Sequence, residues 1–202
     1  MSDAAERIID LYERYATVWD ADRASRPWAE KPWQDSFIQS LSGGATVLDL
    51  GCGSGAPIAR HMAEMGLKIT GVDASPTLIS LCRSRLPKHE WVVADMRSLS
   101  LGKTFDGVLA WDSFFHLKHD DQRSMFNVFA ARAAPSAVLL FNTGTAHGEA
   151  IGNYRGEPLY HASLDSAEYA ELLAQSGSEV VAHVVEDPQA SGRTVWLARS
   201  RR

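Results

Sequence analysis

The feature that most constrains this chain is the stretch Val-Leu-Asp-Leu-Gly-Cys-Gly-Ser-Gly at residues 47–55. An apolar run ends in an acid, three glycines follow at alternate positions, and a helical pattern begins at about residues 56–57. Glycines let a backbone turn tightly and come close to a ligand, and a helix N-terminus presents free N–H groups to it. This strand, loop and helix pattern predicts a nucleotide-binding corner.

A second acid strengthens this interpretation. Residues 67–73 read as another strand, which ends at Asp73. An acid at the tip of the second strand suits hydrogen bonds to the two hydroxyls of a ribose. The alternative is a helix cap, because Ser75 and Pro76 begin a helical pattern and acids favour first turns.

The rest of the chain alternates strands with helices, which predicts a parallel sheet covered on both faces. Two further strands follow a helix at 165–176, with only a short turn-rich loop between them, and form an antiparallel hairpin. The sequence therefore predicts an α/β fold with a mostly parallel sheet, helices on both faces and a C-terminal antiparallel hairpin. The expected strands are 46–50, 68–72, 91–93, 107–111, 137–141, 179–185 and 194–198.

We expect a single domain, in which a helical lid segment at 1–44 precedes an α/β core at 45–202. A helical stripe predicts one helix at 5–18, and a second is expected at 33–41. Five aromatic residues of this segment, here called the lid aromatics, either pack in the core or cover a ligand. Arg23 and Arg26 either are solvated or bind an acidic ligand. Residues 143–163 are expected to form a long irregular segment, either a lid or a surface loop. The lid aromatics are Tyr12, Tyr15, Trp19, Trp28 and Trp33.

Four motifs in this order resemble the class I S-adenosylmethionine-dependent methyltransferases. They are Asp-Leu-Gly-Cys-Gly-Ser-Gly at 49–55, Gly-Val-Asp-Ala-Ser at 71–75, Val-Ala-Asp-Met at 93–96 and Phe-Asp-Gly-Val-Leu-Ala-Trp at 105–111. The resemblance implies a Rossmann-like, seven-stranded, mostly parallel sheet and S-adenosyl-L-methionine as the cofactor. NAD-binding loops usually space the third glycine further on, so the spacing here favours the methyl donor.

The resemblance also implies roles in donor binding. Asp49 is expected near the methionine amino group, Asp73 on the ribose hydroxyls and Asp95 on the adenine amino group, the alternative for Asp95 being a solvated turn acid. Tyr15 is expected to cover the donor. The remaining expected donor-binding residues are Gly51, Cys52, Gly53 and Gly55 in the loop, Ala74 and Met96 beside the adenine, and Trp111, followed by Asp112, beside the methionine part.

Methyl transfer requires an in-line approach of the acceptor, and a base only where the acceptor is protonated. His116, just past the fourth strand, is the candidate base, because an unperturbed histidine titrates near neutrality. The alternative is a packing or capping histidine. We expect methylation of a small-molecule acceptor at oxygen or nitrogen. The rival interpretations are a noncatalytic module that binds S-adenosylmethionine or S-adenosylhomocysteine, and an NAD(P)-dependent oxidoreductase.

Composition sets the remaining expectations. A net charge of −5 argues against a nonspecific grip on nucleic acid, which needs clustered basic residues. No apolar run approaches the ~20 residues that cross a membrane, and the first residues lack a secretory pattern. Two cysteines suggest neither a disulfide framework nor a metal site, and they suit the cytoplasm. We therefore expect a cytoplasmic monomer or homodimer.

Overall fold

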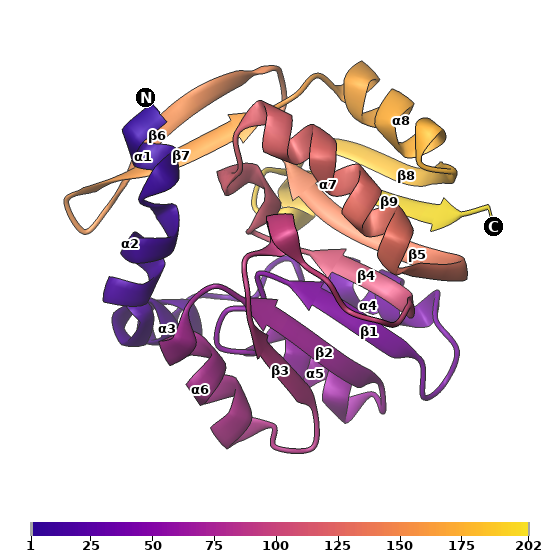
Figure 1. Cartoon of the computed structure of the whole chain (residues 1–202), viewed down its shortest axis with the longest axis horizontal. Helices are drawn as coiled ribbons and strands as arrows, with labels where there is room; N and C mark the ends of the chain where they lie inside the picture. The colour runs from indigo at the N-terminus through magenta and orange to yellow at the C-terminus, as the bar shows by residue number, and fades with distance from the viewer. Residues whose placement is uncertain (1, 202) are drawn as a thin grey trace.

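The structure is a computed structural model that describes residues 2–201. Its main sheet contains β1 (Thr46–Leu50), β2 (Lys68–Asp73), β3 (Glu90–Val93), β4 (Phe105–Ala110), β5 (Ala133–Thr143), β8 (Ser178–Asp187) and β9 (Arg193–Ser200). The strand order is β3-β2-β1-β4-β5-β9-β8 (Figure 1). The first five of these strands pair in parallel, and β9 is antiparallel to both β5 and β8. The predicted fold class is confirmed.

Helices cover both faces of the sheet. Residue Val47 packs on the face covered by α4 (Lys31–Gln39), α5 (Ile58–Glu64) and α6 (Pro76–Arg85), whereas Leu48 and Leu50 pack on the other face, against α7 (His119–Arg132) and α8 (Ser166–Gln175). All three side chains are fully buried. A strand buried on both faces is continuously apolar, which explains the run that precedes the glycine loop. No helix within residues 2–201 has the length and apolar content needed to cross a membrane.

The segment at 143–163 is not irregular, so that expectation was wrong. It contains the strands β6 (Gly148–Tyr154) and β7 (Glu157–Ser163), which pair antiparallel as a separate two-stranded sheet. The two turn residues, Arg155 and Gly156, have φ of 55° and 87°. Two positive φ angles are what a tight hairpin turn requires. Arginine is an unusual residue at that turn, so the hairpin was not evident from sequence.

The N-terminal segment is also more broken than predicted. The expected single helix at 5–18 is divided into α1 (Ser2–Glu6), α2 (Ile8–Arg14) and α3 (Ala16–Ser25). These helices lie beside the β6–β7 hairpin, and α3 lies near α6 (Figure 1). Arg14 pairs with Glu157 of the hairpin at 2.7 Å, and Asp20 forms a bidentate pair with Arg85 of α6 at 2.7 and 2.6 Å. The segment therefore bridges two parts of the chain at the carboxyl edge of the sheet.

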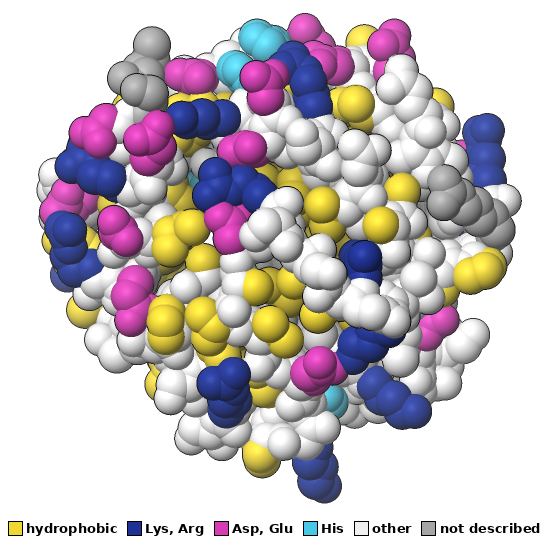
Figure 2. Space-filling model, in the orientation of Figure 1, with side chains coloured by type: hydrophobic (Ala, Val, Ile, Leu, Met, Phe, Trp, Pro, Cys, Tyr) yellow, Lys and Arg dark blue, Asp and Glu magenta, His cyan; other side chains and the backbone are white. Residues whose placement is uncertain are grey.

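The surface gives no sign of one dominant charge on the face that Figure 2 draws. Acidic and basic side chains are interspersed there, mainly toward the rim, and apolar atoms show through the middle of the view.

Three 3-10 turns complete the architecture: η1 (Met96–Ser98), η2 (Phe114–His116) and η3 (Pro188–Ala190). Two of them, η1 and η2, follow the carboxyl ends of β3 and β4 and shape the site described next.

Candidate active site

Two adjoining cavities lie at the carboxyl ends of the parallel strands, where open α/β sheets bind their ligands. The glycine-loop cavity has a volume of about 120 Å³ and is bordered by residues after β1, β2 and β3. The hairpin cavity has a volume of about 890 Å³ and is bordered by the loop after β5, the β6–β7 hairpin and the α3–α4 connection. Four residues line both cavities and form their junction: Tyr12, Trp19, Asp112 and His116.

The glycine loop makes one wall of the smaller cavity. Gly51 has φ of 74°, and a Cβ there would lie 2.2 Å from the Cβ of Ser113. Gly53 has φ of 57°, and a Cβ there would lie 2.8 Å from the ring of Trp19. Both positions combine a left-handed backbone with close packing, so only glycine fits without rearrangement. At both positions the bare Cα packs against another side chain, and both glycines also border the cavity.

Asp73 ties this loop to α6. One carboxylate oxygen accepts from the backbone N–H of Gly53 at 2.9 Å, and the other accepts from that of Ser75 at 2.9 Å. Ser75 is the residue that caps α6, because its hydroxyl accepts from the N–H of Leu78. Burial raises the pKa of Asp73, and the two backbone N–H groups partly offset that effect. Each oxygen keeps lone-pair capacity for a ligand hydroxyl in the cavity.

Asp49, on β1, is a buried acid without a compensating partner. Its side chain is 4% exposed, and its carboxylate accepts no hydrogen bond from any residue within 2–201. Burial, together with the negative charge of Asp73, raises the pKa of Asp49 to about 7. A buried carboxylate in this condition is costly unless a cationic group comes close.

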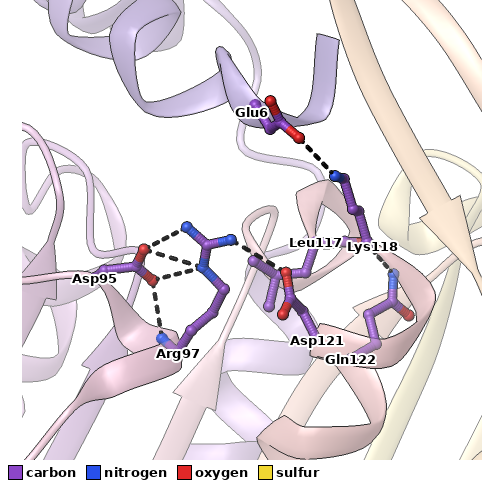
Figure 3. Close-up of polar contacts among 7 residues, drawn as sticks. All are labelled: Glu6, Asp95, Arg97, Leu117, Lys118, Asp121 and Gln122. Carbon is purple, nitrogen blue, oxygen red and sulfur yellow. Dashed lines mark hydrogen bonds and ion pairs between the residues drawn. The ribbon is translucent and has the colours of Figure 1, made fainter. Parts of the chain in front are cut away.

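Asp95 and Arg97 both line the glycine-loop cavity, and they are hydrogen-bonded to each other (Figure 3). The Arg97 guanidinium donates to both Asp95 oxygens and also to Asp121 at 3.1 Å. Burial would raise the pKa of Asp95, but Arg97 holds it below its ordinary value. Lys118 and Glu6 of α1 line the same cavity and pair at 3.1 Å. Asp95 is thus ionised and held in place at the cavity wall.

Hydrogen bonds from Arg193 and Asn142 hold Asp112 in place, which no sequence pattern indicated. It has φ of 50°, a strained value for a non-glycine residue. Arg193 of β9 binds its two oxygens at 2.7 Å each. The side chain of Asn142, fully buried on β5, accepts from the Asp112 N–H and donates to its carboxylate, both at 2.8 Å. This clamp holds a carboxylate at the junction of the two cavities.

His116 lies at the same junction, but it does not titrate near neutrality as expected. Its side chain is 6% exposed, and burial lowers its pKa to about 4. Its Nε2 lies 2.8 Å from the hydroxyl of Tyr12, and its Nδ1 lies 2.8 Å from the carbonyl oxygen of Tyr160. Both ring nitrogens are therefore already hydrogen-bonded, so neither has a free lone pair available to a ligand.

Most of the predicted donor-binding residues lie together. The structure brings Gly51, Gly53, Asp73, Ala74, Asp95 and Met96 to the wall of the glycine-loop cavity. Two others point away from it: the Cys52 sulfur lies near Gly71 in the core, and the Cα of Gly55 faces Cys82. Trp111 is 4% exposed and packs in the core. Tyr15 lines neither cavity and packs on Tyr154 at a centroid distance of 5.8 Å.

Tyr12 and Trp19, two of the lid aromatics, line both cavities, whereas Tyr15 lines neither. The helical spacing of the segment was the available signal, because residues seven apart share a helix face. Arg193 and Asn142 gave no signal, since their role depends on contacts across the sheet. No three His, Cys, Asp or Glu side chains among the described residues gather closely enough to hold a metal ion.

Comparison with known proteins agrees with this geometry. The family model described as "Methyltransferase domain" matches residues 47–136, which include the glycine loop, Asp73, Asp95 and the junction residue Asp112. The family match and the fold support the class I S-adenosylmethionine-dependent methyltransferases as the family of this chain. The resemblance read from the four motifs is thereby confirmed. The matched range ends before the β6–β7 hairpin, which borders the larger cavity.

Individual relatives in this family are distant. The chain is 28% identical over 145 residues to the putative methyltransferase YqeM of Bacillus subtilis, covering 65% of this chain and 55% of that protein. It thus spans about half the length of that relative. It is 25% identical over 199 residues to a dTDP-4-amino-2,3,4,6-tetradeoxy-D-glucose N,N-dimethyltransferase of Saccharopolyspora spinosa, covering 90% of this chain and 80% of that protein.

A solved structure shows the same fold. The 1,6-didemethyltoxoflavin-N1-methyltransferase of Burkholderia thailandensis, crystallised with 1,6-didemethyltoxoflavin and S-adenosylhomocysteine, superposes with a TM-score of 0.77. The alignment covers all of this chain and 90% of that chain, at 19% identity. A likeness at this identity establishes the fold alone.

Proposed function

We propose that this protein transfers a methyl group from S-adenosylmethionine to a small-molecule acceptor, at oxygen or nitrogen, by in-line displacement. The observation that carries the proposal is the junction of two cavities. The smaller is bordered by the glycine loop, Asp73 and Asp95, and the larger opens directly beyond it. A donor held in the first would present its methyl group to an acceptor in the second.

The residues around the smaller cavity fit the donor chemically. Asp49 lies behind this lining, on β1, and is a buried acid that lacks a partner, which suits a nearby ammonium group such as that of the methionine part. The oxygens of Asp73 suit the ribose hydroxyls, and the ionised carboxylate of Asp95 suits the adenine amino group. The bare backbone of Gly51 and Gly53 suits a close approach of the ligand. When bound, the donor supplies an electrophilic methyl carbon on a positively charged sulfur.

The protein's own contribution is orientation and the exclusion of water. The clamped carboxylate of Asp112 and the Trp19 ring border the passage between the cavities. The hairpin cavity, at about 890 Å³, falls within the ~300–1,000 Å³ typical of small-molecule sites. A relative that matches most of this chain is named for methylation at nitrogen of a small molecule, which supports the same acceptor class here.

The rival functions make different predictions. A noncatalytic binding module would bind S-adenosylhomocysteine and produce no turnover with any acceptor. An NAD(P)-dependent oxidoreductase would bind NADH, and the family match and the antiparallel β8–β9 pairing argue against it. The experiment is a thermal-shift and calorimetric titration with S-adenosylmethionine and NADH, followed by an S-adenosylhomocysteine release assay over a panel of amines, phenols and thiols. Donor binding with turnover supports the proposal, whereas NADH binding alone contradicts it.

A further inference from the structure

Tyr12 and His116 form a hydrogen-bonded pair at the junction of the two cavities. The Tyr12 hydroxyl lies 2.8 Å from Nε2 of His116, and the rings meet edge to face at a centroid distance of 5.3 Å. Both residues border both cavities. They come from helix α2 and turn η2, 104 residues apart in sequence, so the tertiary fold alone creates the pair.

A third contact determines which atoms of the pair carry a hydrogen. Nδ1 of His116 lies 2.8 Å from the carbonyl oxygen of Tyr160, and a carbonyl oxygen can only accept. Nδ1 therefore carries the hydrogen, and Nε2 of the neutral ring carries the lone pair. The Tyr12 hydroxyl must then donate to Nε2. Its hydrogen is committed to His116, while its oxygen keeps lone-pair capacity at the cavity junction.

This arrangement limits what Tyr12 can do for a ligand. Its oxygen can accept a hydrogen bond from a ligand N–H or O–H, but the hydroxyl has no second hydrogen to donate. Five other groups interact electrostatically with the pair: Asp112 with both residues, Asp73, Tyr154 and Arg26 with Tyr12, and His161 with His116. Asp112 favours a positive charge on His116, whereas His161 disfavours one.

We propose that Tyr12 is a catalytic residue that takes the proton of the methyl acceptor, and that His116 is the positioning residue that receives the proton Tyr12 gives up. The proposal rests on the methyl transfer proposed above. The acceptor atom bonds to the methyl carbon as the carbon–sulfur bond breaks, and its proton passes to the Tyr12 oxygen. The original Tyr12 proton passes to Nε2 of His116, so every atom and charge is accounted for.

The buried position of His116 is compatible with this step. Protonating a buried imidazole is costly when it adds a charge to the site. Here the positive charge on sulfur disappears as the proton arrives, so the total charge of the site does not change. The step also defines the acceptor class, because the reacting atom must carry a hydrogen. Hydroxyls and primary or secondary amines qualify, and tertiary amines do not.

The first test reads the pair in the free protein by NMR of nitrogen-15-labelled histidine, with His116 assigned from the H116Q variant. The expected signals place the hydrogen on Nδ1 and a hydrogen-bonded lone pair on Nε2. Tyr12→Phe removes only the hydroxyl and should shift the Nε2 signal to that of a free lone pair. A hydrogen on Nε2, or a signal unchanged in Tyr12→Phe, overturns the proposal whether or not an acceptor is known.

The second test measures kcat and KM for S-adenosylmethionine with any acceptor that the release assay identifies. Tyr12→Phe should lower kcat by about 10²-fold and leave KM within about threefold. Tyr15→Phe is the matched control, since Tyr15 lies one turn further along the segment and outside both cavities. A wild-type kcat in Tyr12→Phe, or comparable turnover of a tertiary amine, overturns this proposal alone. Absence of turnover by the wild type contradicts the proposed function itself.

Discussion

The indole ring of Trp19 lies against the bare Cα of Gly53, so that a Cβ on Gly53 would come within 2.8 Å of the ring. The contact joins α3 of the N-terminal segment to the glycine loop. Trp19 lines both cavities, and the glycine-loop cavity, at about 120 Å³, is smaller than the ~300 Å³ at which small-molecule sites usually begin. We therefore expect the Trp19 ring to move when a ligand the size of S-adenosylmethionine binds.

Trp19→Ala should raise the association rate constant of S-adenosylhomocysteine by at least about threefold, because the ring no longer has to move aside. Stopped-flow fluorescence measures this rate. Trp28→Ala is the control, because the Trp28 ring packs on His61 and lines neither cavity. Equal association rates in wild type and Trp19→Ala would show that the ring does not limit entry.

Asp49→Asn should change stability and ligand affinity in opposite directions. Burial raises the pKa of Asp49 to about 7 from an ordinary value of 3.8, so the native state resists losing this proton. The stability that protonated Asp49 contributes to the native state is therefore lost as pH rises from about 3.8 through 7. At pH 8 the ligand-free variant should be more stable by roughly 1–3 kcal/mol, and its affinity for S-adenosylhomocysteine should fall at least about tenfold. Urea denaturation and calorimetry measure the two effects, and a parallel change in both contradicts the account.

His116 should contribute the opposite pH dependence. Burial lowers its pKa to about 4 from an ordinary value of 6.5, so the unfolded chain takes up this proton more readily. The stability it contributes is complete above pH 6.5 and is lost as pH falls toward 4. Between pH 7.5 and 5 the wild type should lose about 2 kcal/mol more than His116→Gln does.

Urea denaturation at the two pH values measures this difference. Substitution of the exposed His147 by Gln serves as the control and should leave the wild-type pH dependence unchanged. An equal loss in His116→Gln and wild type would mean that the buried imidazole does not carry this linkage.

The Asp112–Arg193 pair should show measurable coupling. Both side chains are about three-quarters buried, and the two contacts are 2.7 Å each. Charge-assisted bidentate hydrogen bonds of this kind are worth about 1–3 kcal/mol. A double-mutant cycle with Asp112→Asn and Arg193→Gln should recover a coupling energy in that range by chemical denaturation. A coupling near zero would mean that the clamp does not hold the carboxylate.

The fold was predictable because its signals are local. The apolar run of β1 and the glycine loop after it depend on neighbouring residues, and so does the acid at the end of β2. Each of the seven strands of the main sheet overlaps a predicted one. The β6–β7 hairpin escaped prediction because its turn carries Arg155-Gly156, a pair without a strong hairpin preference.

The site was predictable only in part, for a related reason. Asp73 and Asp95 end strands, so sequence order places them at one edge of the sheet. Asp112, expected at the site together with Trp111, lines the junction, whereas Trp111 packs in the core. Tyr15 lies three positions from Tyr12, which lines the junction in its place. Trp111 lies just past the end of β4 and Tyr15 lies at the break between α2 and α3, so neither strand alternation nor a single helical stripe determines where these side chains point. The Tyr12–His116 contact depends on how the N-terminal segment docks, which no local pattern encodes.

The most direct test of the account is calorimetric titration of the wild type with S-adenosylhomocysteine, compared with Asp73→Ala. If the methyl donor binds in the glycine-loop cavity, the wild type should show one site, and Asp73→Ala should bind more weakly by roughly 1–3 kcal/mol, the cost of lost hydrogen bonds to a charged group. Circular dichroism should show that both proteins are folded. No heat from a folded wild type at millimolar ligand, or equal affinity in the two proteins, would contradict the placement of the methyl donor in the glycine-loop cavity.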